Sequence, residues 1–217
     1  QPALVMKTSS AGFSVIDREN MLSKINEIKS QINGKCPNIY LVHGDFTDDE
    51  MNGLYNHPKM KAHISFTHGE GFGRPLLEAS LSEKPVIASN WSGHLDFLDS
   101  KYSVLLEGSF EKVQKGSFPD QFFVEGSEWF TVNYQKASQT LRKVYRSYKK
   151  YTANAKRLSL NNSKNFSLNK MTEEFGKILD RHVPEFPKQV ELKLPKLKKV
   201  SSEEPKKLKL PKLKKVN

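Results

Sequence analysis

The chain has 217 residues, of which 36% are hydrophobic and 27% charged, a composition typical of a globular protein with one or two domains. Its formal net charge of +11 resembles that of a nucleic-acid-binding protein, but residues 188–217 contain eleven Lys and three Glu, so residues 1–187 have a net charge of only +3. No apolar run approaches the ~20 residues of a membrane-spanning helix, and the single cysteine, Cys36, excludes an internal disulfide bond. We therefore expect a cytoplasmic protein.

The first third of the chain alternates predicted strands and helices. An apolar strand is predicted at residues 3–6, followed by an amphipathic helix at about 18–32 and a second strand at 38–42. Residues 43–45 (His-Gly-Asp) then form a turn, and a short helix begins near Asp48. This alternation predicts an α/β fold with a Rossmann-like, doubly wound parallel sheet.

Residues 65–90 contain an apolar run, a glycine-rich turn, a helix and a second apolar run, which predict a strand–loop–helix–strand unit. Gly69, Gly71 and Gly73 allow the backbone to turn tightly and to approach a ligand. Pro75 suits the first turn of the helix that follows. Unpaired N–H groups at such a turn bind anions, above all phosphates, so we expect a ligand site in this loop.

Glu70 and Glu78 stand on either side of this turn, with seven residues between them. A carboxylate next to a diphosphate would be repelled, so these two side chains are better suited to accept hydrogen bonds from sugar hydroxyls. Arg74 lies between them and could supply positive charge to a phosphate. The alternative roles are an ordinary loop carboxylate for Glu70, an exposed helix residue for Glu78 and a surface arginine for Arg74.

The pattern Glu-x7-Glu with an internal Gly-Phe-Gly-x-Pro, followed by Glu-Ala-Ser and Lys-Pro-Val-Ile-Ala-Ser, resembles the donor-site signature of retaining glycosyltransferases with the GT-B fold (group 1, family 4-like). The resemblance covers residues 3–98 in good register and extends more loosely to about 179. It implies the C-terminal, donor-binding half of an enzyme that transfers a sugar from a nucleotide sugar to a hydroxyl acceptor with retention of configuration. The nucleotide sugar is then the substrate, and no cofactor or metal is expected.

The resemblance also implies roles for individual residues. Glu70 would orient the sugar as the catalytic residue, Glu78 would accept the ribose hydroxyls, and the backbone near Gly44 and Asp45 would meet the base. The remaining donor-binding positions are those whose amides or charge would face the diphosphate: Gly71, Phe72, Gly73, Arg74, Pro75 and Leu76. In the mechanism proposed for such enzymes the leaving phosphate oxygen takes the acceptor proton, so this half need not supply a general base.

Five further residues lie where open parallel sheets bind ligands, at the carboxyl ends of predicted strands. Lys7 follows the first strand and could reach toward the donor phosphates, and the others stand in two loops: His68, Trp91, Gly93 and His94. For the histidines and the tryptophan, a capping or partly buried structural role is the alternative. The six histidines show no His-x3-His or His-Glu-x2-His spacing, so no metal site is predicted.

A dinucleotide-binding Rossmann fingerprint fits poorly in this segment. It would require a glycine near position 74, where the chain has Arg74, and an acidic residue at the end of the following strand. Ser89 and Asn90 occupy that end instead.

The rest of the folded part is predicted from weaker patterns. A strand is expected at residues 102–106, and residues 107–130 have no clear period, so we expect a loop with a short strand near Phe122. Two helices follow, a long amphipathic one at about 133–155 and another at about 168–182, with Ser167 as its N-cap. The predicted domains are a nucleotide-sugar-binding domain (1–132), C-terminal helices that pack on it (133–187) and a tail (188–217).

The tail contains an internal repeat, Leu-Lys-Leu-Pro-Lys-Leu-Lys-Lys-Val, at residues 192–200 and again at 208–216. Proline opposes a helix and the segment has little apolar surface, so we expect it to be disordered and solvated. The alternative is a contact with an acidic protein or an anionic surface. Specific nucleic-acid recognition is not expected, because the tail lacks Arg and interleaved aromatic residues.

In the resembling enzymes, a strand and turn that precede this region carry an Arg and a Lys for the diphosphate, and an N-terminal domain binds the acceptor. Neither is visible in residues 1–217. The chain would therefore be a fragment, which we favour, a subunit of a split enzyme that needs a partner chain, or an inactive remnant. The alternative function is a non-catalytic, glycosyltransferase-like binding or assembly module that docks through its basic tail, against which the intact Glu-x7-Glu pattern argues.

Overall fold

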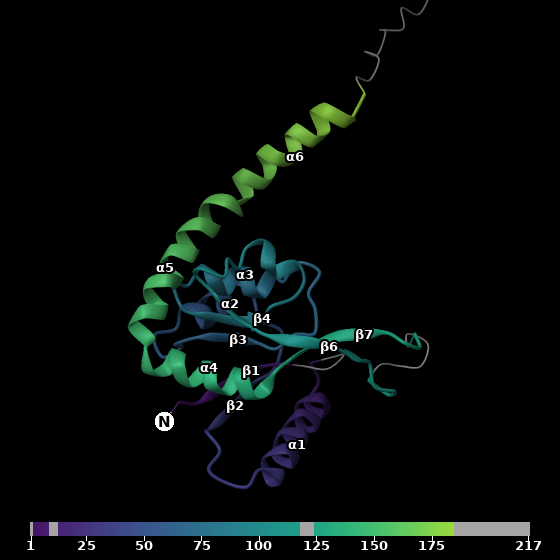
Figure 1. Ribbon diagram of the computed structural model, residues 1–217, viewed down its shortest axis with the longest axis vertical. Helices are drawn as coiled ribbons and strands as arrows, with labels where there is room; N and C mark the ends of the chain where they lie inside the picture. The colour runs from purple at the N-terminus through teal and green to yellow at the C-terminus, as the bar shows by residue number, and fades with distance from the viewer. Residues whose placement is uncertain (1, 9–12, 118–123, 185–217) are drawn as a thin grey trace, which may run out of the picture. The chain divides into compact units, whose positions relative to one another are not determined.

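A computed structural model describes residues 2–8, 13–117 and 124–184 of the chain. The chain divides into one unit of residues 1–175 and a second that begins at Gly176. The helices and strands in chain order are β1 (Leu4–Lys7), α1 (Val15–Gln31), β2 (Ile39–Val42), α2 (Asp48–Asn56), β3 (His63–Ser65), α3 (Arg74–Ser80), β4 (Val86–Ser89), the 3-10 helix η1 (Gly93–Asp96), β5 (Val104–Leu106), β6 (Gly108–Lys112), β7 (Glu128–Val132), α4 (Tyr134–Arg146), α5 (Tyr148–Asn165) and α6 (Leu168–His182) (Figure 1).

The strands of the first unit are mostly parallel. β1 pairs with β2, and β3, β4 and β5 form a second sheet in that order, in which Ile87 lies opposite both Ile64 and Val104. β6 and β7 form a separate antiparallel pair. The predicted α/β class with parallel strands is therefore confirmed, with the parallel strands divided between two sheets.

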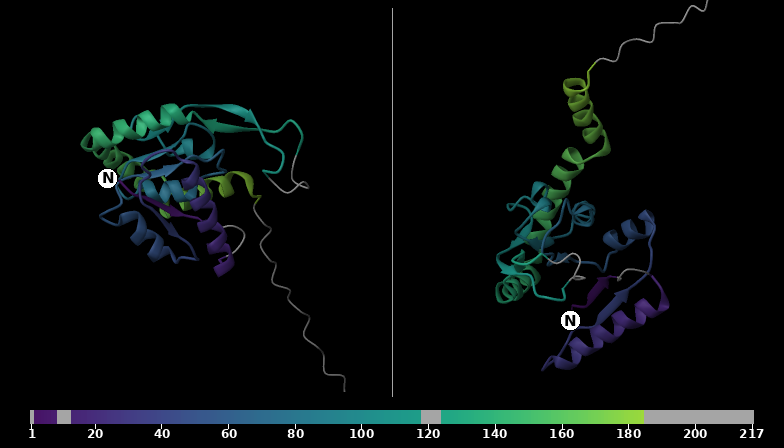
Figure 2. Two further views of the ribbon diagram at one scale, coloured as in Figure 1. Left: turned by 90° about the horizontal axis from the view of Figure 1, so that it is seen from below. Right: turned by 90° about the vertical axis from the view of Figure 1, so that its right-hand side faces the viewer.

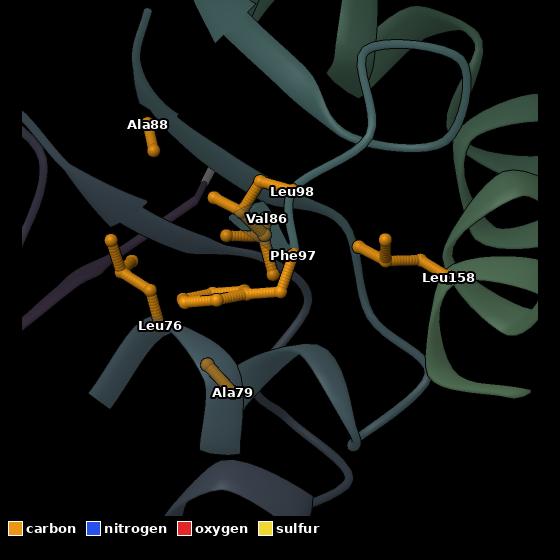
Figure 3. Packing of buried hydrophobic residues seen from close by; sticks show 7 residues of the cluster. All are labelled: Leu76, Ala79, Val86, Ala88, Phe97, Leu98 and Leu158. Atoms are coloured by element: carbon orange, nitrogen blue, oxygen red, sulfur yellow. The ribbon is translucent and has the colours of Figure 1, made fainter. Parts of the chain in front are cut away.

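β4 is the centre of the core because both of its faces are covered. Val86 and Ala88 point to one face and Ile87 to the other, as the two-residue period of a strand requires. On the first face they pack with residues of α3, α5 and the segment after η1: Leu76, Ala79, Phe97, Leu98 and Leu158 (Figure 3). On the second face Ile87 packs with residues of β5, β7 and α4: Leu106, Phe130, Val132, Ala137 and Val144. Continuous apolar strands such as β4 are typical of sheets covered on both faces.

The β1–α1–β2 region is much less well buried. α1 lies along one side of the β1–β2 pair (Figure 2), but among the described residues from 2 to 62 no apolar side chain is buried, and Asp17 alone belongs to the buried class. At the start of α1, Val15 and Ile16 are 75% and 74% exposed. This region therefore obtains little stabilisation from the burial of apolar surface.

We predict that backbone amides of β1, α1 and β2 exchange hydrogen at least about tenfold faster than those of β4, because segments with few buried apolar contacts open at a lower free-energy cost. Hydrogen–deuterium exchange followed by mass spectrometry of peptides measures both regions in one sample. Equal protection of β2 and β4 would contradict this expectation.

Two helix predictions differ from the structure in their bounds. α1 begins at Val15 instead of residue 18, because the Ser14 hydroxyl accepts a hydrogen bond from the Asp17 N–H and caps the helix three residues earlier.

The single helix expected at 133–155 is wrong: α4 ends at Arg146, Ser147 has non-helical dihedral angles (φ −113°, ψ 32°), and α5 continues to Asn165. The break has a packing reason, since α4 covers the Ile87 face of β4 whereas α5 carries Leu158 to the opposite face.

The loop predicted at residues 107–130 is also wrong where the structure describes it. β6 and β7 pair from Gly108 opposite Val132 to Lys112 opposite Glu128. Because every residue of β6 is exposed, its sequence lacks the alternation that a half-buried strand shows. The strand expected near Phe122 lies outside the described residues.

Other predicted elements agree with the structure. The Thr47 side chain and Glu50 form a capping box at the start of α2. In α6 the Ser167 hydroxyl accepts a hydrogen bond from the Lys170 N–H at 3.2 Å, as expected of an N-cap. The strand expected at the start of residues 65–90 lies earlier than predicted, because β3 (His63–Ser65) ends at residue 65. The tail of residues 188–217 and its repeat lie outside the described residues, and the three-domain division stays a prediction.

Candidate functional site

The glycine-rich loop of residues 69–73 follows β3 and leads directly into α3. Gly73 has φ 86°, in the left-handed region that favours glycine, and a Cβ there would lie 3.0 Å from the Cβ of His94. The Gly73 carbonyl accepts hydrogen bonds from the N–H groups of Leu76 and Leu77. Leu76 is buried in the core and Pro75 has no N–H, so neither can offer a free backbone donor to a ligand.

Four consecutive amides remain available in this loop. Within the described chain, the N–H groups of residues 71–74 have no hydrogen-bond partner. Nor does the half-buried Glu70 carboxylate make a hydrogen bond or ion pair to any described residue. One loop thus presents a row of unpaired donors next to an unpaired acceptor, an arrangement that suits a ligand with both an anionic group and hydroxyl groups.

The loop after β4 supports the glycine-rich loop by direct backbone contact. The Gly93 N–H donates to the Glu70 carbonyl at 3.0 Å, and the Ser92 hydroxyl accepts from the Glu70 N–H at 2.7 Å and donates to the Glu70 carbonyl at 3.1 Å. A Cβ at Gly93 would lie 2.0 Å from the Gly71 carbonyl oxygen. Gly93, which the sequence suggested as a ligand contact, therefore already has a structural role, and the role of Ser92 was missed.

Ser92 also holds an unusual backbone conformation, with φ 80° for a residue that has a side chain. Such angles cost energy and persist where surrounding contacts impose them. Here the contacts are the two hydrogen bonds of Ser92 to Glu70. The backbone of Glu70, the residue expected to orient the sugar, is therefore fixed by hydrogen bonds to the loop after β4.

Arg74 and Glu78, which were expected to bind different parts of a ligand, contact each other. The Arg74 Nε donates to Glu78 Oε1 at 2.6 Å, and its Nη2 lies 3.3 Å from Asp48 Oδ1. The hydrogen bond to Glu78, together with the charges of Glu78 and Asp48, raises the pKa of Arg74. The Arg74 side chain is 71% exposed, so the pair is weak and can exchange for another anion. Asp48 was not predicted as a site residue.

The turn after β2 has its own network. The Lys7 ammonium donates to the Gly44 carbonyl at 2.9 Å and lies 4.9 Å from the ring centroid of Phe46. His43 Nε2 lies 2.6 Å from Asp17 Oδ2, and both side chains are almost completely buried. Lys7 and the Gly44 turn are thus in direct contact, and their roles toward a donor stay a prediction. The His43–Asp17 pair was missed because Asp17 lay outside the predicted helix.

The β6–β7 hairpin contacts both candidate loops through aromatic side chains. His68 Nδ1 donates to the Phe130 carbonyl at 2.7 Å, and its ring stacks on Trp129 with centroids 3.9 Å apart. Trp91 meets Phe110 edge to face at 4.6 Å. His68 and Trp91 therefore have structural contacts that link their loops to the hairpin. No sequence signal indicated the hairpin.

His94 is completely buried, and its Nε2 donates to the Ser89 carbonyl at 2.7 Å. Its environment is that of a structural histidine, the alternative that the sequence left open. Among the described residues, no group of three His, Cys, Asp or Glu side chains has the arrangement of a metal site, and no helix is long and apolar enough to cross a membrane. The expected absence of a metal stays a prediction.

No protein-family model matches the sequence, and a search of curated proteins gives no match. Solved structures do match. The structure of HepE from Anabaena in complex with UDP and glucose aligns with a TM-score of 0.57 and 13% identity, covering 82% of this chain and 40% of HepE. A glycosyltransferase from Rickettsia africae aligns with a TM-score of 0.54 and 19% identity, covering 82% of this chain and 39% of that one. The chain thus has the fold of a part of these glycosyltransferases and spans about two fifths of their length.

Proposed function

We propose that the chain is the donor-binding half of a retaining glycosyltransferase with the GT-B fold. The observation that carries the proposal is the row of amides at residues 71–74 beside the carboxylate of Glu70, all without a partner in the described part of the chain, on a loop that Ser92 holds at Glu70. The fold similarity supports it, because HepE was solved with UDP and glucose and also with UDP-glucose. The proposed ligand is a nucleoside diphosphate sugar.

In this proposal each part of the donor meets a group of matching chemistry. The amides of residues 71–74 face the diphosphate, where fixed donors stabilise the charge that develops on the leaving group. Glu70 accepts hydrogen bonds from the sugar and orients it, and Glu78 accepts those of the ribose. Arg74 turns from Glu78 toward the phosphates, and the backbone of Gly44 and Asp45 meets the base.

The second wall of the cleft is proposed to come from an acceptor-binding N-terminal domain or a partner chain, since this chain corresponds to about two fifths of HepE. The substrate is the nucleotide sugar, and no cofactor or metal forms part of the proposal. We propose the cytoplasm as its location, because Cys36 is a free thiol that suits a reducing compartment. By itself the chain should bind the donor weakly and transfer little sugar.

Calorimetric titration with uridine, guanosine and adenosine diphosphates tests the proposal, and one of them is expected to give measurable heat. We further predict that Glu78→Gln weakens nucleotide binding by about 1–3 kcal/mol, the scale of a hydrogen bond to a charged group. The thermal transition should barely move, because the partner of Glu78 in the free protein is the exposed Arg74.

Glu83→Gln is the matched control, since it removes the same charge from an exposed carboxylate whose partner is Lys156 at 3.8 Å. It should leave nucleotide binding unchanged. No heat with any of the three nucleotides from a folded protein would argue strongly against a donor site. A large fall in the melting temperature of Glu78→Gln with unchanged binding would give Glu78 a structural role instead.

A further inference from the structure

The outer face of α4 and α5 has an unusual charge. Residues 134–165, which form these two helices and Ser147 between them, contain nine Lys or Arg and no Asp or Glu. All nine side chains belong to exposed residues: Lys136, Arg142, Lys143, Arg146, Lys149, Lys150, Lys156, Arg157 and Lys164. We propose that this basic face binds the surface of an anionic membrane. The proposal is independent of the sugar-transfer function.

The low net charge of the folded part conceals this asymmetry. Residues 1–133 are acidic, because they contain twelve Lys or Arg and seventeen Asp or Glu. The positive charge of the two helices therefore exceeds the net positive charge of residues 1–187. Local neutralisation is slight. Lys136 pairs with Glu107, and Lys156 lies 3.8 Å from Glu83. In the described chain, the other seven cations have no ion pair.

The packing of the helices directs these charges toward solvent. Ala137 and Val144 of α4 and Leu158 of α5 belong to the two core clusters, and Ala155 of α5 is also buried, so the apolar faces are already occupied. The cations lie on the remaining faces. Lys150, Arg157 and Lys164, for example, follow one another at seven-residue intervals, which places them along one side of α5 about 10.5 Å apart. Because the apolar faces are buried, binding would be electrostatic adsorption to head groups, without insertion of the helices.

Two observations favour a lipid surface over a nucleic acid. Tyr145 and Leu160 are 68% and 70% exposed among the cations, and such a mixture of aromatic, apolar and basic side chains suits the head-group region of a lipid surface. In addition, an open depression of about 340 Å³ on α5 lies between two cations and is lined by Tyr148, Lys149, Thr152, Ala153 and Lys156. It is shallow and formed by α5 alone, unlike the basic groove with stacking aromatics along which proteins bind single-stranded nucleic acids.

Co-sedimentation of the full chain with lipid vesicles tests the proposal. The chain should bind vesicles of phosphatidylcholine mixed with phosphatidylserine, bind vesicles of phosphatidylcholine alone far less, and dissociate as salt is raised. The test variant combines Arg142→Gln, Arg146→Gln, Lys150→Gln and Arg157→Gln. Each Lys or Arg near an anionic membrane contributes about fivefold in affinity, so the test variant should lose at least about tenfold.

Two controls lose the same charge elsewhere and should bind nearly as well as the unmodified chain. One carries Lys24→Gln, Lys29→Gln, Lys59→Gln and Lys115→Gln; the other, in the tail, carries Lys196→Gln, Lys198→Gln, Lys212→Gln and Lys214→Gln. A third chain with Arg142→Lys, Arg146→Lys and Arg157→Lys keeps the charge and should keep binding, which separates an electrostatic effect from a folding defect. Melting temperatures are measured for all chains. If the test variant unfolds, a double variant with only Arg142→Gln and Arg146→Gln takes its place.

Three results would overturn the proposal. The test variant could bind vesicles as well as the unmodified chain does. The tail variant could lose binding while the test variant keeps it, which would place the membrane contact in the tail. The unmodified chain could bind an RNA or DNA oligonucleotide and not the anionic vesicles, which would make a nucleic acid the partner of this face.

Discussion

Gly93→Ala is expected to lower the free energy of unfolding by about 3 kcal/mol or more, in the range that only a severe steric conflict or a comparable defect produces. The added Cβ would lie 2.0 Å from the Gly71 carbonyl oxygen and 2.9 Å from that of Glu70. Both obstacles are backbone atoms, so no side-chain rotation can relieve the conflict. The two loops would have to separate, which breaks the hydrogen bond from the Gly93 N–H to Glu70.

Chemical denaturation of both forms measures this difference, and Gly71→Ala is the matched control. A Cβ at Gly71 would have no atom within 4 Å, and its φ is not in the left-handed region. Its effect on stability should therefore stay within about 1 kcal/mol, as for other glycine replacements at compatible positions. If Gly93→Ala retained its stability and still bound a nucleotide like the unmodified chain, the contact between the two loops would not have the importance that we assign to it.

Acid is expected to destabilise the fold through His63. The pKa of His63 is lowered from 6.5 to about 4, first by burial and then by the positive charge of Lys84, while a hydrogen bond to the Tyr55 backbone opposes the shift. The unfolded chain therefore takes up this proton near pH 6.5 and the folded chain only near pH 4. The contribution of neutral His63 to the free energy of unfolding is fully present above pH 6.5. It is lost as the pH drops from 6.5 to 4, by roughly 3 kcal/mol at most.

His63→Gln removes the titrating group and keeps a side chain that can hydrogen-bond to Ser82, whose hydroxyl lies 3.2 Å from His63 Nε2. The difference in unfolding free energy between pH 7 and pH 4.5 should be smaller in this variant by about 2–3 kcal/mol. His57→Gln, which alters an exposed histidine, should leave the difference unchanged. An identical acid response of the unmodified chain and His63→Gln would show that other groups cause it.

The elements that the sequence predicted well are those whose signals are local. The run Val86–Ser89 is apolar because both faces of β4 are covered, and a strand of this kind is recognisable by itself. A cap such as Ser167 acts within three residues of its own position. The glycine-rich loop was predictable for the same reason, since the left-handed conformation of Gly73 is a property of one residue.

The features that the sequence did not predict depend on distant partners. β6 has no alternating pattern because it is exposed, and its strand conformation results from pairing with β7. Ser147 interrupts two helices with continuous apolar spacing because α4 and α5 must reach opposite faces of β4. Local secondary-structure propensity cannot predict such features, since the surface on which each element packs is formed by other segments.

The same distinction holds for the candidate site and for the charge of the chain. The sequence alone determined the presence of two carboxylates around a glycine-rich turn, because the pattern lies within one short segment. Only the tertiary structure decided that Glu70 is held by Ser92, 22 residues away, that Arg74 pairs with Glu78 and Asp48, and that the nine cations of α4 and α5 are all exposed. Hydrogen bonds and charges act through space over a few ångströms, so their partners become known only when the fold has brought distant residues together.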